Sequence, residues 1–129
     1  MAGATLLDEV LALARAGEVD AAAEVLREAR GNGPLAEEHL SVFFQLTSKR
    51  GPTDEALAIC AEALALDLRP LARSNWTLRR GLLCLERQER ARALADLQAV
   101  LKLQANEGHV EQARAALLRV AALPRRPGS

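Results

Sequence analysis

Residues 51–67 read GPTDEALAICAEALALD, and they repeat a pattern found thirty-four positions earlier in residues 17–30, GEVDAAAEVLREAR. In each copy a turn glycine is followed by an acid and then by two alanines one heptad apart. The matched positions are Gly17, Asp20, Ala22 and Ala29 in one copy and Gly51, Asp54, Ala56 and Ala63 in the other. A weaker third copy contains Ala93, Leu97, Val100 and Leu103. A repeat of this length predicts consecutive helical pairs that stack on one another.

The composition favours a single all-α domain. The chain has 129 residues, and half of them are hydrophobic, which is enough for one domain with a buried core. Ala, Leu, Glu and Arg dominate the sequence, and these residues are strong helix formers. We expect one helical repeat domain over residues 1–123 and a disordered tail over residues 124–129.

The charge pattern gives no reason to expect nucleic acid as a partner. Basic and acidic residues are equal at 17 each. Up to Ser48 eight acids face three bases, whereas from Lys49 onward fourteen bases face nine acids. This polarity would orient a partner or favour head-to-tail contact between copies. The arginines between Arg69 and Arg92 are interrupted by acids and lack interleaved aromatic residues, so we interpret them as a solvated basic face.

The sequence predicts a cytoplasmic protein without a membrane partner. Its first residues, MAGATLLDEVLALA, lack the basic region of a secretory signal and meet acids at Asp8 and Glu9. No apolar run reaches the roughly 20 residues that span a bilayer. Cys60 and Cys84 fall inside helical patterns, so we expect two buried thiols in a reducing compartment.

Capping and breaking residues predict the helix boundaries. Thr5 and Asp8 form a capping-box pattern at the start of a first helix that ends at Gly17. The repeat predicts a glycine at position 88, but the residue there is Gln88. Residues 86–89 therefore allow either a turn or a continuous helix. We favour the turn because the repeat register continues on both sides. Pro34 is expected in the first turn of its helix. The other helices are expected at about 18–30, 34–49, 71–86, 90–104 and 109–122, with one more between Thr53 and the DLRP stretch at 67–70.

These residues resemble the tetratricopeptide repeat, a helix–turn–helix unit of thirty-four residues with small side chains where its helices approach closely. The family's paired small residues fall on the repeat alanines described above, with Val100 in place of one alanine. The glycine of the first helix is kept as Gly81, whereas Val10 and Phe44 occupy the equivalent sites, and most of the family's aromatic positions hold Leu, Thr or Cys. The repeats would cover residues 3–36, 37–70 and 74–107, followed by a capping helix. The resemblance implies a right-handed superhelical stack of antiparallel helix pairs with about seven helices, and an ordinary helical bundle is the alternative.

The last predicted helix is expected to cap the repeat. It would bury Val110, Ala113, Leu117 and Val120 and expose Glu111, Gln112, Arg114 and Arg119. A polar outer face of this kind keeps the end of a helical repeat soluble.

The sequence contains no arrangement that indicates catalysis, a metal site or a cofactor. Its two histidines, His39 and His109, lack metal-ligand spacing to Cys, Asp or Glu, and both are expected to be solvated. The GNG stretch at 31–33 is expected to be a linker, and serines 41, 48 and 74 have no base in repeat register. We therefore expect neither an enzyme nor a bound cofactor or metal.

The family resemblance implies a concave surface lined by the first helix of each pair. The positions that project into it are Leu7, Leu11, Ser41, Gln45, Lys49, Asn75, Leu78, Arg79 and Leu82. Such a mixture suits a peptide, because apolar residues bury side chains while polar ones hold the backbone or acidic groups. Co-chaperone members hold a C-terminal carboxylate with a clamp of lysines and asparagines. Here only Arg79 keeps a cation, and Leu7, Leu11 and Val42 replace the rest, so that partner is not expected. For each leucine, packing between helices is the alternative.

We therefore expect a non-catalytic adaptor or scaffold that binds a protein or peptide partner. Two other functions remain open. A secretion chaperone would have this size and repeat count. A structural module would self-associate, as a homodimer for example, through the wide apolar face of the first helix. That face consists of Leu6, Leu7, Val10, Leu11 and Leu13.

Overall fold

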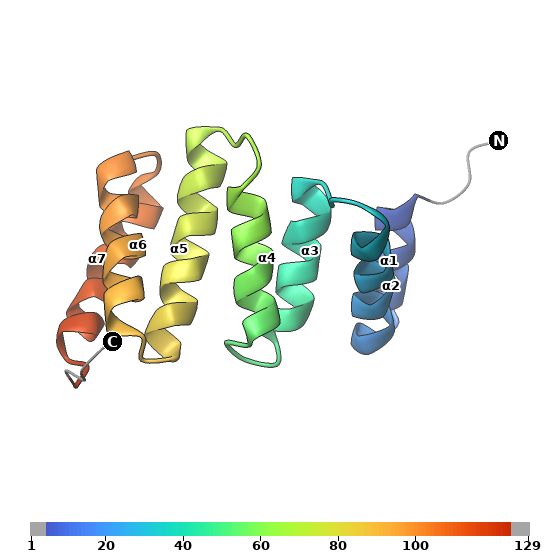
Figure 1. The fold of residues 1–129 in the computed structure, drawn as a ribbon, viewed down its shortest axis with the longest axis horizontal. Coiled ribbons are helices and arrows are strands. Elements are labelled where there is room, and N and C mark those ends of the chain that lie inside the picture. Colours follow the sequence, from blue (N-terminus) through green and yellow to red (C-terminus); the bar gives the residue numbers. More distant parts are fainter. Residues whose placement is uncertain (1–4, 125–129) are drawn as a thin grey trace. The chain divides into compact units, whose positions relative to one another are not determined.

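The computed structural model describes residues 5–124, and its regular secondary structure there is entirely helical (Figure 1). The helices are α1 (Leu6–Arg15), α2 (Val19–Asn32), α3 (Glu37–Ser48), α4 (Asp54–Leu64), α5 (Pro70–Glu86), α6 (Arg90–Leu103) and α7 (Glu107–Ala121). The prediction of an all-α protein with about seven helices is confirmed within this range. None of these helices combines the length and apolar character that a membrane crossing requires. Of the predicted tail, residues 125–129 lie outside the described part of the chain.

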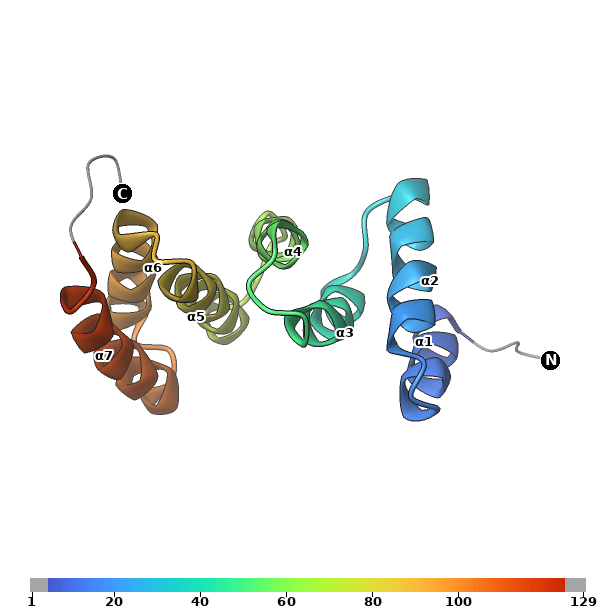
Figure 2. The same ribbon diagram turned by 90° about the horizontal axis from the view of Figure 1, so that it is seen from below.

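The described residues form two compact units that divide within α4, after Ile59. The N-terminal unit contains α1, α2, α3 and the first turns of α4, and in it α2 packs against both α1 and α3. The C-terminal unit contains the end of α4 with α5, α6 and α7, and each of these last three helices contacts the other two (Figure 2). Each unit is thus built around one antiparallel helical hairpin, α1–α2 or α5–α6.

The α1–α2 hairpin closes with a Schellman turn. The Glu18 N–H donates to the Leu13 carbonyl at 2.9 Å, and the Gly17 N–H donates to the Ala14 carbonyl at 3.0 Å. Gly17 has a φ of +82°, a left-handed conformation that costs glycine little. The predicted end of the first helix at Gly17 is therefore confirmed.

The α5–α6 hairpin closes with the same pattern of hydrogen bonds. The Glu89 N–H donates to the Cys84 carbonyl and the Gln88 N–H to the Leu85 carbonyl, both at 2.9 Å. Gln88 has a φ of +59° and so adopts the left-handed conformation of Gly17 without being glycine. The turn favoured for residues 86–89 is confirmed, and α5 and α6 are separate helices.

The alanines and larger apolar residues of the repeat lie mostly in the core. Ala29 is half-buried and Leu103 is 36% exposed, so these two depart from the pattern. The repeat residues with no exposed surface are Ala22, Ala56, Ala63, Ala93, Leu97 and Val100. Small or compact side chains at these places let neighbouring helices pack closely.

Gly81 marks a close approach of α5 to α6. A Cβ atom on Gly81 would lie 3.0 Å from Cδ2 of Leu97 and 3.1 Å from Cβ of Asp96. Beside this contact the Arg80 guanidinium donates two hydrogen bonds of 2.9 Å to the Asp96 carboxylate. The lack of a side chain at Gly81 lets the two helices lie close together, and the bidentate Arg80–Asp96 ion pair connects them.

The start of α3 differs from the prediction. Pro34 is not in the first turn, because α3 begins at Glu37 and its N-cap residue, Ala36, is extended with a ψ of 161°. The preceding Leu35 is buried, so the chain first inserts an apolar side chain and then enters the helix. The proline at the first helical position is Pro70, at the start of α5.

Two predicted helix caps are confirmed. In the capping box of α1 the Asp8 N–H donates to Oγ1 of Thr5 at 3.1 Å, and the Thr5 N–H donates back to the Asp8 carboxylate at 3.3 Å. Oγ1 of Thr53 accepts the Ala56 N–H at 3.1 Å at the start of α4. Each bond satisfies a backbone N–H that the helix itself leaves without a partner.

Candidate partner-binding surfaces

Five of the predicted partner-binding residues lie in the N-terminal unit. Leu7 and Leu11 are half-buried on α1, and Ser41 is half-buried on α3. Gln45, on α3, and Lys49, directly after it, are exposed. This unit therefore presents partly covered leucines on one helix and polar side chains on another.

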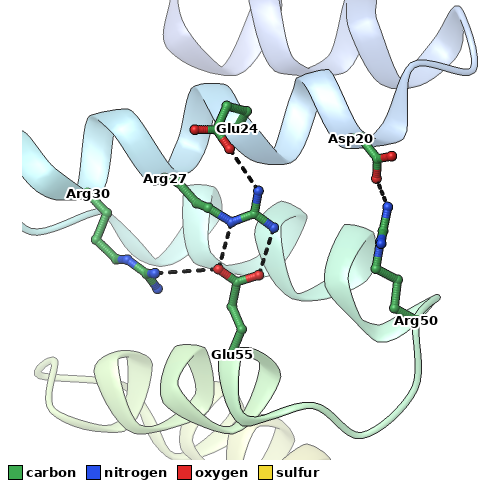
Figure 3. Close-up of polar contacts among 6 residues, drawn as sticks. All are labelled: Asp20, Glu24, Arg27, Arg30, Arg50 and Glu55. Carbon is green, nitrogen blue, oxygen red and sulfur yellow. Dashed lines mark hydrogen bonds and ion pairs between the residues drawn. The ribbon is translucent and has the colours of Figure 1, made fainter.

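Lys49 lines an open pocket of about 660 Å³ with Arg50 and residues 17–21 around the start of α2. The Arg50 guanidinium forms an ion pair with the Asp20 carboxylate (Figure 3). Glu18 also lines the pocket, so positive and negative side chains are mixed there. Its lining is therefore neither purely cationic nor purely anionic, and Val19 and Ala21 add apolar surface.

The other four predicted residues lie on α5, in the C-terminal unit. Asn75 and Leu82 are half-buried, and the Arg79 guanidinium lies 4.5 Å from the centroid of the Trp76 ring. Leu78 is 3% exposed, so it packs inside the protein, which was the alternative open for each leucine. Asn75, Arg79 and Leu82 remain the candidate contacts on this helix.

Asn75 lines a pocket of about 450 Å³ between α5 and α7, which we call the α5–α7 pocket. Leu71 and Ala72 of α5 and Asn106 and His109 at the start of α7 complete its lining. Leu71 is 53% exposed, so an apolar surface lies beside polar amides. The Asn106 carboxamide caps α7 by accepting the His109 N–H at 3.0 Å.

His109 and Ser74 form a pair that the sequence did not indicate. Oγ of Ser74 and Nδ1 of His109 are 3.0 Å apart. His39 and His109 are both half-buried, so neither is fully solvated as predicted, and Ser74 does lie beside a base. Ser74 has no exposed surface, however, so its hydroxyl cannot reach a substrate. This hydrogen bond connects α7 to α5. It involves Nδ1 of the His109 ring and not Nε2.

A cluster of ion pairs connects α2 to the first turn of α4 in the N-terminal unit (Figure 3). The Arg27 guanidinium donates to both carboxylate oxygens of Glu55, at 2.8 and 2.9 Å, and to Glu24 at 3.0 Å. The Arg30 guanidinium is 3.6 Å from Glu55 and lies over the Phe43 ring, 5.0 Å from its centroid. Hydrogen bonding from Arg27 lowers the pKa of Glu55 below its ordinary value, which keeps the carboxylate ionised.

The two cysteines are free and buried, as predicted. Burial raises the pKa of the Cys60 thiol to about 12 and also raises the pKa of Cys84. Both groups are therefore neutral thiols near pH 7, a form with low nucleophilicity. Neither is suited to act as a catalytic nucleophile.

Within residues 5–124, no group of three or more His, Cys, Asp or Glu side chains is placed to hold a metal ion. Comparison with protein-family models, curated proteins and solved structures finds no match for the chain. The resemblance to the tetratricopeptide repeat therefore stays a prediction.

Proposed function

We propose that this chain is a non-catalytic protein-interaction module, a cytoplasmic adaptor or scaffold. In this proposal its helical pairs form a right-handed tetratricopeptide-like stack whose concave surface holds a peptide or helix of a partner protein. Two hairpins with the same Schellman turn, one at Gly17 and one at Gln88, support the repeat. The buried alanines Ala22 and Ala93 at matching places in those hairpins support it further.

The α5–α7 pocket is the observation that carries the peptide-binding part of the proposal. Its volume of about 450 Å³ suits a few side chains of a peptide. The Asn75 carboxamide can both donate and accept, so it can hold a peptide backbone. The exposed Leu71 beside it supplies apolar surface for a partner side chain.

The candidate residues of α5 form one line along the helix. Leu71, Asn75, Arg79 and Leu82 follow one another at spacings of three or four residues, which places them on the same face. We call this line the α5 stripe. A peptide lying along it would meet apolar, amide, cationic and again apolar groups in turn. Arg79 would favour an acidic side chain at the peptide position that faces it.

Capture from a lysate of cells that express the protein tests this function. Arg79→Glu reverses the charge of the α5 stripe, and Leu82→Asp places a carboxylate in its apolar part. Each substitution should reduce recovery of the same partner at least tenfold. Lys102→Glu and Leu103→Asp make the same two changes on α6 and should leave recovery unchanged.

Circular dichroism melting must show that the compared variants remain folded. Unchanged recovery with both stripe variants would contradict the proposal. A partner that is captured by the stripe but is insoluble when produced without this chain would favour the secretion-chaperone alternative over a scaffold.

A further inference from the structure

The outer face of α7 carries the most exposed large hydrophobic side chain in residues 5–124. Leu118 is 76% exposed, compared with 53% for Leu71 and 36% for Leu103. The buried face of the same helix consists of Ala113, Ala116 and Val120. Leu118 therefore lies on the side of α7 that no other helix of its unit covers. The predicted polar outer face is present, but an apolar side chain stands in it.

The surroundings of Leu118 suit a second helix. Ala115 and Ala121 are exposed and lie on the same face of α7 as Leu118, and the exposed Ala122 follows at the C-cap. Their small side chains allow another helix to approach closely. Arg114 and Arg119 are exposed beside Leu118, whereas the exposed Glu111 lies two turns before it on the same face, so a helix that covers Leu118 should carry an acidic group opposite Arg114. We call this surface the tail face.

The two units of the chain carry equal and opposite formal charge. Residues 1–59 contain ten acids and five bases, whereas residues 60–129 contain seven acids and twelve bases. The tail face belongs to the positive unit. The negative charge that would complement it is therefore available on the N-terminal unit of another copy of the same chain.

The outer side of α1 has the groups that the tail face lacks. Asp8, Ala12 and Ala16 are exposed there, Leu11 is half-buried at its edge, and the exposed Arg15 follows one turn after Leu11. We call this surface the head face. It combines an acid, an apolar side chain and small residues that permit close packing.

We propose that the tail face of one copy docks on the head face of a second copy. In a parallel arrangement Leu118 packs against Leu11, and Arg114 then lies opposite Asp8, because each charged residue precedes its leucine by about one turn. The contact joins two different surfaces, so each copy keeps one face free and can bind a further copy. This self-association is separate from the peptide site on the α5 stripe.

The docked area is small, so the association should be weak and dependent on salt. α1 has ten residues, which corresponds to about 15 Å of helix. A contact of that length falls among small, transient interfaces. Salt at about 0.5 M shortens the Debye length to roughly 4 Å and should weaken the Arg114–Asp8 attraction.

Sedimentation velocity over a hundredfold range of protein concentration tests the proposal. At low salt the weight-average mass should rise above the single-chain 13.9 kDa, and 0.5 M salt should reduce the rise. Leu118→Glu, which blocks the tail face at an exposed position, should abolish it. Leu103→Glu is the matched control at an exposed leucine of the same unit, outside the α5 stripe, and should leave the rise in mass unchanged. A mass that stays at one chain throughout would overturn the proposal.

A mixing experiment separates head-to-tail docking from contact between identical faces. Ala12→Arg blocks the head face without touching the core, so this variant and Leu118→Glu should each remain monomeric alone. Mixed in equal amounts, they should form a complex of two chains, because the mixture contains one intact head and one intact tail. Failure of the mixture to associate, or association of either variant alone, would overturn the proposal. Peptide capture by the Leu118→Glu variant should be normal, so the two functions can fail independently.

Discussion

The α1–α2 and α5–α6 hairpins close with the same Schellman turn, yet their helices meet through different residues. Aligning Gly17 with Gln88 places the fully buried Val10 at the position of Gly81. Gly81 leaves little room for a Cβ atom, because Cδ2 of Leu97 would lie 3.0 Å away. The two hairpins must therefore differ in spacing at this point. A shared turn fixes how a hairpin reverses, whereas the packed residues fix how closely its helices lie.

The hairpins also differ in which helices their bidentate ion pairs connect. The bidentate pair of the C-terminal hairpin, Arg80–Asp96, joins its own two helices. The bidentate pair of the N-terminal hairpin leaves it, from Arg27 on α2 to Glu55 on α4. One hairpin is thus held internally, and the other is held by the helix that follows α3. Bidentate geometry makes both pairs stronger than a single surface contact.

The largest expected effect on stability comes from placing a side chain at Gly81, where α5 and α6 lie close together. Gly81→Val introduces a branched side chain against Leu97 and Asp96 and should lower the free energy of unfolding by about 3 kcal/mol. Gly31→Val is the control, because a Cβ atom on this helical glycine meets nothing within 4 Å. It should change stability by less than about 0.5 kcal/mol. Urea unfolding followed by circular dichroism measures both, and equal effects would contradict the close approach of α5 to α6.

A smaller effect is expected from the ion pair that leaves the N-terminal hairpin. Glu55→Gln should lower stability by about 1 kcal/mol at pH 7, because Arg27 loses a charged acceptor. The folded-state pKa of Glu55 is lowered from 4.5, so its stabilising contribution is complete above that pH and is lost as the pH falls through the lowered value. The difference between wild type and variant should therefore shrink in acid.

Urea titrations at several pH values from 7 down to about 2.5 measure this change. Glu28→Gln removes an exposed glutamate from α2 and should have little effect at any pH. A difference between wild type and Glu55→Gln that is independent of pH would contradict the assignment to the ion pair.

The smallest effect concerns the turn that the hairpins share. Gln88→Gly should raise the free energy of unfolding by about 0.5 to 1 kcal/mol, because glycine adopts a positive φ without the strain that a side chain adds. The reciprocal Gly17→Gln should lower it by about 1 kcal/mol. Thermal melting compares the two variants. Shifts of the same sign would show that the turns are not equivalent.

Local signals in the sequence were sufficient to predict most of the helical structure. Thr5 with Asp8 predicted a cap, and the repeat register predicted a turn at Gln88 although no breaker stands there. The start of α3 could not be predicted in this way. Pro34 fits a first turn by local rules, but burial of Leu35 delays the helix, and burial depends on packing between elements.

The candidate surfaces were harder to predict because they depend on contacts between distant residues. Ser74 and His109 are thirty-five positions apart, and no spacing rule connects a serine inside one helix to the first turn of another. Leu78 has the register of a surface residue but is buried. Leu118 was in neither of the two faces predicted for the last helix, and its exposure follows from where the other helices of the unit lie.

The burial of Cys60 and Cys84 has a practical consequence. Both thiols are uncharged near neutral pH and enclosed, so maleimide reagents should react with them slowly. A single cysteine introduced on an exposed site, such as Gln112, would then accept a fluorophore almost exclusively. The protein can therefore be labelled at one chosen site while Cys60 and Cys84 stay in place.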